Sequence, residues 1–306
     1  MSQPVIAVKK KQESNFVNNF IMGGISAGIS KTVAAPLERI KIIFQTQDVH
    51  HMVQSGKKEK YLGITNTLKK VYKQEGLLSL WRGNLINVIR YIPTQALNLA
   101  FVDFNKSLFK QYDKNTQKFK FMLSHIFAGG MAGAQSQVFV YPFEFARTRL
   151  AADLGSKQER EYNSLSQFFQ KIYQTSGIKG FYKGFWISIV FAFVYRGVYF
   201  GLYNSGKEIL FNNQSVFVKF LAAQAITALA GTIVYPIDTV RRRLMMQSGR
   251  TEILYNSSLD CFQKIYQQEG FKALYKGGLS NVYRGVGGAL VLVLYDELHA
   301  FYQKQF

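Results

Sequence analysis

Acidic and basic side chains recur in a fixed pattern behind three prolines of the chain. The hexapeptides PLERIK, PFEFAR and PIDTVR begin at Pro36, Pro142 and Pro236, and each has an acid two residues and a base five residues after the proline. Each is followed by a second motif, EGLLSLWRG, SGIKGFYKG or EGFKALYKG. Two linked motifs that recur in register about every 100 residues indicate an internal threefold repeat. The chemistry they offer is ion pairing and anion binding, because no nucleophile, phosphate-binding glycine loop or metal-ligand spacing accompanies them.

Apolar segments must position these charges. Before the prolines lie FIMGGISAGISKTVAA, HIFAGGMAGAQSQVFVY and FLAAQAITALAGTIVY, and after the second motifs lie NLINVIRYIPTQALNLAF, FWISIVFAFVYRGVYFGLY and LSNVYRGVGGALVLVLY. With their flanks, all six approach the roughly 20 residues that cross a bilayer as a helix. Between the two spans of a repeat, stretches such as ITNTLKKVYKQEG have helical periodicity and a basic face, which predicts a short helix at the membrane surface.

The expected fold class is therefore an all-α membrane protein with six transmembrane helices and three short surface helices. We expect an N-terminal tail over residues 1–15 and repeats over residues 16–112, 113–213 and 214–306. Gly24 with Gly28, and Gly129 with Gly133, have the GxxxG spacing that lets membrane helices approach closely.

Composition excludes several other classes of protein. The chain is 48% hydrophobic and 18% charged, which is typical of a membrane protein rather than of two soluble domains. The net charge of +20 does not indicate nucleic-acid binding, because the bases are scattered among apolar runs. The single cysteine, Cys261, excludes an internal disulfide and a cysteine-based metal site, and the N-terminal segment has the pattern of neither a signal peptide nor a transit peptide. We expect no cofactor, no metal and no enzymatic activity.

The triplicated motifs resemble those of the mitochondrial carrier family over nearly the whole chain, from about Phe16 to the C-terminus. The resemblance implies a six-helix barrel with threefold pseudosymmetry in the mitochondrial inner membrane, which acts as a monomer and exchanges solutes by alternating access. The prolines are expected to kink the helices inward. The family's matrix-side gate then consists of three ion pairs: Glu38 with Arg147, Glu144 with Arg241, and Asp238 with Lys41.

A second gate, on the cytoplasmic side, is implied by the same resemblance. In the family each even-numbered span ends with an acid and, three residues later, a base. The corresponding residues here are Asp103 and Lys106, Asn204 and Lys207, and Asp296 and His299. Because Asn204 and His299 replace an acid and a base that would face each other, we expect this gate to have two ion pairs and to be weaker than the matrix gate.

Residues that differ between the repeats point to a bound ligand. Charged or aromatic side chains without charged equivalents in all three repeats are Lys31, Arg90, Phe191, Tyr195, Arg196 and Arg284. Lysine and arginine around one cavity suit a polyphosphate, because arginine binds phosphate oxygens in pairs and lysine acts as a point charge. Phe191 and Tyr195 are candidates for stacking on a base, and lipid-facing packing is an equal alternative for Phe191.

One further segment resembles a subfamily, the ADP/ATP carriers, whose signature is RRRMMM. The matching residues are Arg241, Arg242, Arg243, Leu244, Met245 and Met246. By this resemblance the substrates are ADP and ATP, and the substrate-binding residues are Lys31, Arg90, Phe191, Ala192, Tyr195, Arg242 and Arg284. Phe191 departs from the subfamily, which has glycine there. Two alternatives stay open: a carrier of another nucleotide or anion, and a carrier fold that serves as a structural subunit of a respiratory or ATP-synthase assembly.

The aromatic-base-glycine triplets that end the second motifs also predict lipid binding. They stand at the starts of helices, where amides and the helix dipole favour phosphate, and the base adds attraction to anionic lipid. We expect cardiolipin at Trp81, Arg82 and Gly83, at Tyr182, Lys183 and Gly184, and at Tyr275, Lys276 and Gly277.

Overall fold

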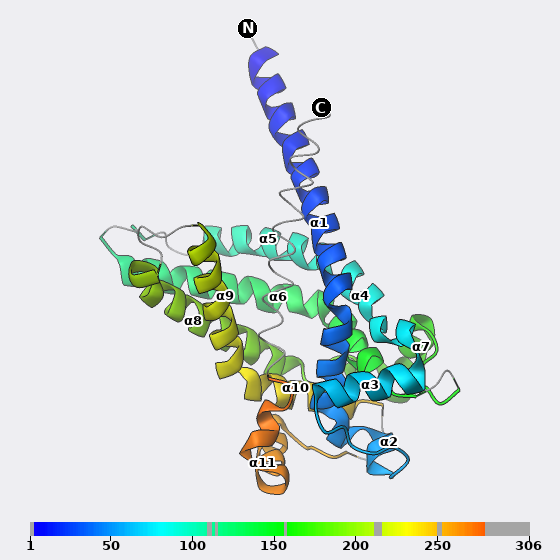
Figure 1. The fold of residues 1–306 in the computed structure, drawn as a ribbon. Helices are drawn as coiled ribbons and strands as arrows, with labels where there is room; N and C mark the ends of the chain where they lie inside the picture. The colour runs from blue at the N-terminus through cyan, green and yellow to red at the C-terminus, as the bar shows by residue number, and fades with distance from the viewer. Residues whose placement is uncertain are drawn as a thin grey trace.

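The computed structural model describes residues 3–108, 112–113, 116–155, 158–210, 216–249 and 253–278. Within these ranges every regular element is a helix and no strand occurs, in agreement with the expected all-α class (Figure 1). The elements are α1 (Gln3–Thr46), η1 (Gln47–Val49), α2 (His51–Gln54), α3 (Ile64–Glu75), η2 (Leu77–Trp81), α4 (Asn84–Ile89), α5 (Tyr91–Leu108), α6 (Lys118–Ala152), α7 (Leu165–Gly180), α8 (Phe185–Leu210), α9 (Val216–Ile233), α10 (Tyr235–Met246), α11 (Ser258–Glu269) and η3 (Phe271–Tyr275).

Each repeat begins with a long helical segment that carries the motif proline. α1 and α6 stay helical through Pro36 and Pro142, whereas the third repeat is divided into α9 and α10, bent by 57° at a break just before Pro236. Proline lacks an amide donor and clashes with the preceding turn, which permits such a break but does not by itself require it, since α1 and α6 continue through their prolines. α1 already begins at Gln3, so the segment expected as a tail is helical, and it extends well beyond the neighbouring helices (Figure 1).

The three surface helices are α3, α7 and α11, one in each repeat. The side chains of Ser164 and Ser257 cap α7 and α11 by accepting hydrogen bonds from backbone amides of their first turns. Each surface helix packs its apolar face against the end of a proline-bearing helix, and residues of a neighbouring repeat complete each cluster. The buried core of the described residues therefore includes three similar clusters, at the end of the molecule where α1, α6 and α10 meet.

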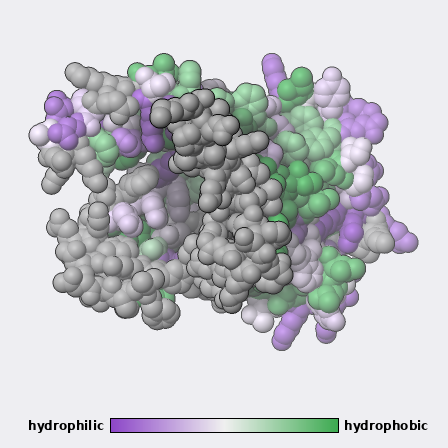
Figure 2. Space-filling model, turned by 90° about the horizontal axis from the view of Figure 1, so that it is seen from above, coloured by the Kyte–Doolittle hydropathy of each residue, from purple (hydrophilic) through white to green (hydrophobic). Residues whose placement is uncertain are grey.

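Exposed apolar side chains distinguish the long helices from those of a soluble protein. On α1, Ile25, Ile29 and Val33 follow one another at four-residue spacing and are 50%, 44% and 59% exposed, whereas Ser26 and Ser30 are buried. Figure 2 shows that apolar side chains lie open on the surface of the molecule. An apolar stripe that faces outward suits contact with lipid.

Among the described helices, one is long and apolar enough by itself to cross a membrane, the segment Phe185–Tyr203 of α8, and the bent pair of α9 and α10 is a second if it counts as one span. Within the described residues, α1 is not such a helix. α5 packs along α6, and α8 packs along α9 (Figure 1). The sixth expected span lies outside the described residues.

Candidate functional site

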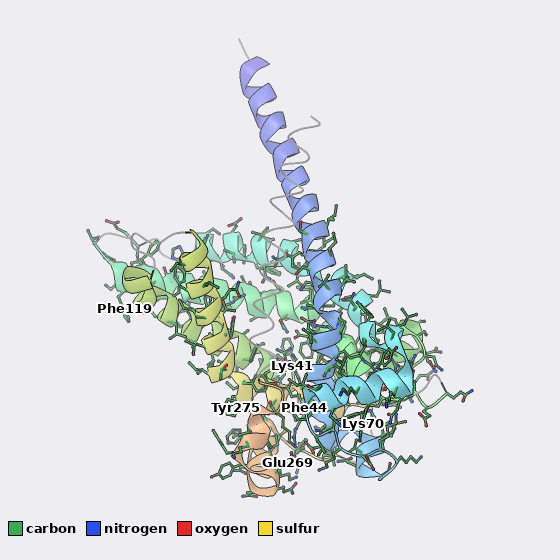
Figure 3. The ribbon with its side chains drawn as sticks, in the orientation of Figure 1. Lys41, Phe44, Lys70, Phe119, Glu269 and Tyr275 are labelled. Carbon is green, nitrogen blue, oxygen red and sulfur yellow. The ribbon has the colours of Figure 1, made fainter. Side chains whose placement is uncertain are left out.

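Three ion pairs join α1, α6 and α10 in a cycle that we call the matrix ring. Each helix contributes one acid and one base, and each acid takes its base from the next repeat. The pairs are Glu38 with Arg147, Glu144 with Arg241, and Asp238 with Lys41, whose Nζ lies 3.6 Å from Oδ2. Lys41 lies near the end of α1 that meets α10 (Figure 3). The structure thus brings together all six residues expected in the matrix gate.

A side-chain amide supports every acid of the ring. Asn87 Nδ2 donates to Glu38 at 3.3 Å, and Gln137 Nε2 donates to Glu144 at 2.7 Å. Gln45 Nε2 lies 3.5 Å from Asp238 and donates more closely, at 2.8 Å, to the neighbouring Thr239 hydroxyl. The acid side chains differ in burial, with Asp238 7%, Glu144 14% and Glu38 34% exposed. The three pairs are therefore unequal in their contact with solvent.

The glycines of the aromatic-base-glycine triplets pack directly behind the bases of the ring. Gly83, Gly184 and Gly277 have φ angles of 84°, 81° and 83°, which favour glycine. A Cβ atom at these positions would lie 3.1 Å, 3.2 Å and 3.5 Å from the backbone carbonyl oxygens of Arg147, Arg241 and Lys41, respectively. Each of these three glycines thus packs on the backbone of the ring base in the next repeat.

Three further arginines are buried next to the ring, and sequence reasoning did not single out two of them. Arg39 pairs with Glu75 at 2.7 Å and donates to backbone carbonyls of Ser79, Ala151 and Asp153. Arg149 pairs with Glu161 at 3.0 Å, and Arg243 pairs with Glu269. All three side chains are at most 1% exposed. The second-motif acids Glu75 and Glu269, which need buried partners, signal Arg39 and Arg243, whereas no such acid points to Arg149, whose partner is Glu161.

The three arginines of the RRRLMM segment have three different partners. Arg241 belongs to the matrix ring, Arg242 Nε lies 3.0 Å from Asp238 Oδ2, and Arg243 is buried with Glu269. Leu244, Met245 and Met246 are buried in the apolar clusters. Arg242 is therefore the arginine of this segment that lies beside the ring without being one of its six members.

The structure describes some of the residues that are expected to contact the substrate. Lys31 Nζ lies 5.1 Å from the centre of the Tyr91 ring. Arg90, at the junction of α4 and α5, has a buried Nε atom with no hydrogen-bond partner among the described residues, and its charge acts on Glu144 together with that of Arg242. Such an unpaired atom suits a site that receives an anion.

Aromatic side chains of α8 lie beside this region. Phe191 and Tyr195 have parallel rings 6.1 Å apart, and the Phe191 ring lies over Arg241. Ala192 is half-buried on the same helix, and Arg284 lies outside the described residues. Arg196 packs against α6, where a Cβ on Gly133 would come within 2.7 Å of its guanidinium.

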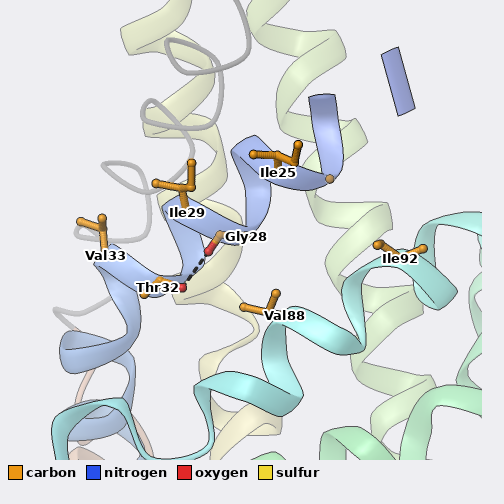
Figure 4. A pocket seen from close by; sticks show the side chains of 8 residues that line it. Ile25, Gly28, Ile29, Thr32, Val33, Val88 and Ile92 are labelled. Carbon is orange, nitrogen blue, oxygen red and sulfur yellow. Dashed lines mark hydrogen bonds between the residues drawn. The ribbon is translucent and has the colours of Figure 1, made fainter. Parts of the chain in front are cut away.

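A groove between α1 and α4–α5 is apolar and contains none of the expected substrate contacts (Figure 4). Gly24, Gly28, Val88 and Ile92 form part of its lining, and Thr32 donates to the carbonyl of Gly28 at 2.8 Å. A Cβ on Gly28 would touch Val88, so the first GxxxG pair faces the second helical segment of its own repeat.

The residues expected in the cytoplasmic gate are described in part. Asp103 and Lys106 are exposed on α5. Asn204 and Lys207 belong to α8, but their side chains lie outside the described part of the structure, as do Asp296 and His299 altogether.

The bases of the expected lipid sites are held in different ways. Arg82 pairs with Asp153 at 2.5 Å, and Lys276 pairs with Asp48 and Glu269, so these two charges are directed into the protein. Lys183 is exposed, and Ser248, which stands twelve residues after its proline as Asp48 does, donates to the carbonyl of Gly180 at 2.7 Å. The expected contribution of the base to lipid attraction is thus unequal among the three triplets.

Asp48 is the most strongly perturbed acid outside the expected spans. Burial alone would raise its pKa, but hydrogen bonds and charges from Lys276, Lys60 and Arg243 outweigh burial and lower the pKa to about 2. Asp48 is therefore ionised at neutral pH and links η1 of the first repeat to the third repeat. Among the described residues there is no group of three or more His, Cys, Asp and Glu side chains that could hold a metal ion.

Comparison with known proteins places these features in a family. The model of the mitochondrial carrier protein family matches residues 12–113, 118–214 and 212–306. The chain is 49% identical over 304 residues to the "ADP,ATP carrier protein" of Parachlorella kessleri, covering 97% of this chain and 89% of that protein. It is 49% identical over 294 residues to "ADP/ATP translocase 3" of Homo sapiens, covering 94% and 98%, and 47% identical to the "Mitochondrial substrate carrier family protein ancA" of Dictyostelium discoideum, covering 95% and 94%. The chain belongs to the mitochondrial carrier family.

Proposed function

We propose that the chain exchanges ADP for ATP across the mitochondrial inner membrane, as a multi-pass carrier that works by alternating access. The observation that carries this proposal is the matrix ring with the cations Arg90 and Arg242 beside it, in a chain 49% identical to proteins named ADP/ATP translocases along nearly their whole length. The phosphates of a nucleotide are the anions that such arginines bind best. The solute is moved without being changed, so the activity is transport and not catalysis.

Arg242 couples binding of the nucleotide to opening of the ring. Its Nε shares the Asp238 carboxylate with Lys41. A phosphate bound by Arg242 competes with Asp238 for this guanidinium and disturbs the third pair of the ring. Breaking a buried ion pair from one side costs about 3–5 kcal/mol, so the ring opens readily only when a ligand offsets this cost. Arg90, Lys31 and Arg284 supply the remaining phosphate contacts.

The cytoplasmic gate closes when the matrix ring opens. Its two remaining pairs are Asp103 with Lys207 and Asp296 with Lys106, while Asn204 and His299 remove the third. With three pairs on one side and two on the other, the resting balance favours the state in which the matrix ring is closed. The protein works as a monomer, and cardiolipin binds at the three aromatic-base-glycine triplets.

Reconstitution tests the proposal directly. The purified chain is placed in cardiolipin-containing liposomes loaded with ATP, and uptake of labelled ADP is measured. Arg90→Ala and Arg284→Ala should each lower uptake by more than tenfold, because each removes a charge-assisted contact of about 1.5–3 kcal/mol. Lys70→Ala is the matched control, because Lys70 pairs with the exposed Glu59 at the surface and should keep full uptake.

Two results would contradict the proposal. Wild-type uptake in both arginine variants would remove these residues from the site. No uptake by the unmodified protein would favour the structural-subunit alternative. The departures that motivate this alternative are Phe191, Ser176, Asn204 and His299. Competition by other nucleotides and anions in the same assay tests the remaining alternative, a different substrate.

A further inference from the structure

Phe191 contacts the matrix ring itself. Its ring centre lies 5.2 Å from the guanidinium carbon of Arg241, within the range of a cation–π interaction. Phe191 comes from α8 in the second repeat and Arg241 from α10 in the third, so the contact joins the same two repeats as the Glu144–Arg241 ion pair.

Arg241 is the base of the matrix ring whose side chain is least exposed to solvent. Its side chain is 7% exposed, compared with 15% for Lys41 and 19% for Arg147. One nitrogen donates to Glu144, whereas Nε is buried with no hydrogen-bond partner in the described part of the chain. A guanidinium removed from water in this way gains most from an aromatic face, because the attraction increases when the cation is desolvated.

We propose that Phe191 is a positioning residue of the matrix ring: its ring holds Arg241 against Glu144 and shields the pair from water, which stabilises the closed ring. This inference deepens the proposed exchange function and rests on it for its role in transport. It also gives Phe191 a role other than stacking on a base, since a base on the face that covers Arg241 has to displace that arginine first.

The other two bases provide an internal comparison. Lys41 Nζ lies 4.8 Å from the centre of the Tyr235 ring, and the described residues place no ring over Arg147. Tyr235 also donates its hydroxyl to the carbonyl of Lys276, so it is held by its own repeat. A substitution of Phe191 therefore tests the effect of an aromatic face on a ring base more cleanly than a substitution of Tyr235, which would also remove a hydrogen bond.

A thermal double-mutant cycle in detergent tests the contact without any nucleotide. Phe191→Leu keeps an apolar side chain but loses the aromatic face, and it should lower the unfolding midpoint by about 2 °C. Phe191→Tyr should restore the midpoint. In an Arg241→Gln background, Phe191→Leu should have little further effect. Phe193→Leu is the control, because Phe193 packs on Gly130 of α6 and should act equally in both backgrounds. An equal loss from Phe191→Leu with and without Arg241 would overturn the proposal.

A second measurement needs no Arg241 variant. Inhibition of ADP uptake is compared for unlabelled ADP and for inorganic tripolyphosphate, which has no base, in the Phe191→Leu protein. If Phe191 acts on the ring, the two apparent affinities change by the same factor. A loss of about fivefold or more for ADP alone is the size expected for a stacked base and would overturn the proposal. If no uptake occurs at all, the exchange function fails while the thermal cycle still decides on the contact.

Discussion

Replacing Asp238 by Asn removes one acid of the matrix ring but leaves two cations without their partner. Arg242 Nε lies 3.0 Å and Lys41 Nζ lies 3.6 Å from its carboxylate, whose side chain is 7% exposed. Loss of one partner from a buried pair costs about 3–5 kcal/mol, and we take about 3 kcal/mol because the Lys41 contact is long. Glu38→Gln leaves only Arg147, and Glu38 is 34% exposed, so the expected loss is about 1 kcal/mol.

The measurement is the unfolding midpoint of each purified variant in detergent. At about 2 °C per kcal/mol for a chain of this size, Asp238→Asn should lower the midpoint by about 6 °C and Glu38→Gln by about 2 °C. Glu59→Gln is the control, since Glu59 is 88% exposed and should leave the midpoint unchanged. Equal losses for the two ring acids would refute the argument that burial and shared partners rank the pairs.

Four other predictions concern sites away from these acids. Cys261 is buried and burial raises the pKa of its thiol to about 12, so a maleimide dye at pH 7 should label the native protein slowly and label it fully at the unfolding transition; fast labelling of the native state would contradict this. The lowered pKa of Asp48 contributes stability that is complete above about pH 4 and is lost as the pH falls toward 2, so Asp48→Asn should flatten the pH dependence of the midpoint in that window. Asn204→Asp combined with His299→Lys should shift the population several-fold toward the matrix-open state, measured by binding of conformation-specific inhibitors, and an unchanged ratio would remove the argument about the weaker gate. Lys183→Gln should reduce the gain in midpoint on adding cardiolipin more than changes at the two paired triplet bases do.

The matrix ring was predictable because one spacing repeats three times. An acid and a base three residues apart lie on one helix face, and repetition supplies a neighbouring helix with the complementary residues. The buried arginines follow no such register. Arg39 stands three residues after its proline, whereas Arg149 and Arg243 stand seven residues after theirs. Their acids differ as well, because Ser176 occupies the place of the second-motif acid in the second repeat and Glu161 supplies the charge instead.

Hydropathy alone identified the spans less well than the repeat did. α8 has one charged residue, Arg196, in its segment Phe185–Tyr203, whereas α1 carries Lys31, Glu38 and Lys41 within or beside its apolar part. A helix that exposes one face to lipid and another to a polar passage needs fewer apolar residues than one surrounded by lipid. The break before Pro236 could not be predicted from the sequence either, because Pro36 and Pro142 occur in the same motif without interrupting their helices.

The contacts between the triplet glycines and the backbone of the ring bases limit how the repeats can move. Gly83 lies behind Arg147, Gly184 behind Arg241 and Gly277 behind Lys41, and the ion pairs of the ring run around the molecule in the same direction. Because the contacts form a closed cycle, every repeat contacts both of the others. A rotation of one repeat therefore disturbs the interface with the repeat before it and the interface with the repeat after it at the same time. In the exchange that we propose, the three repeats would therefore rotate together, and the passage would open in one concerted step rather than pair by pair.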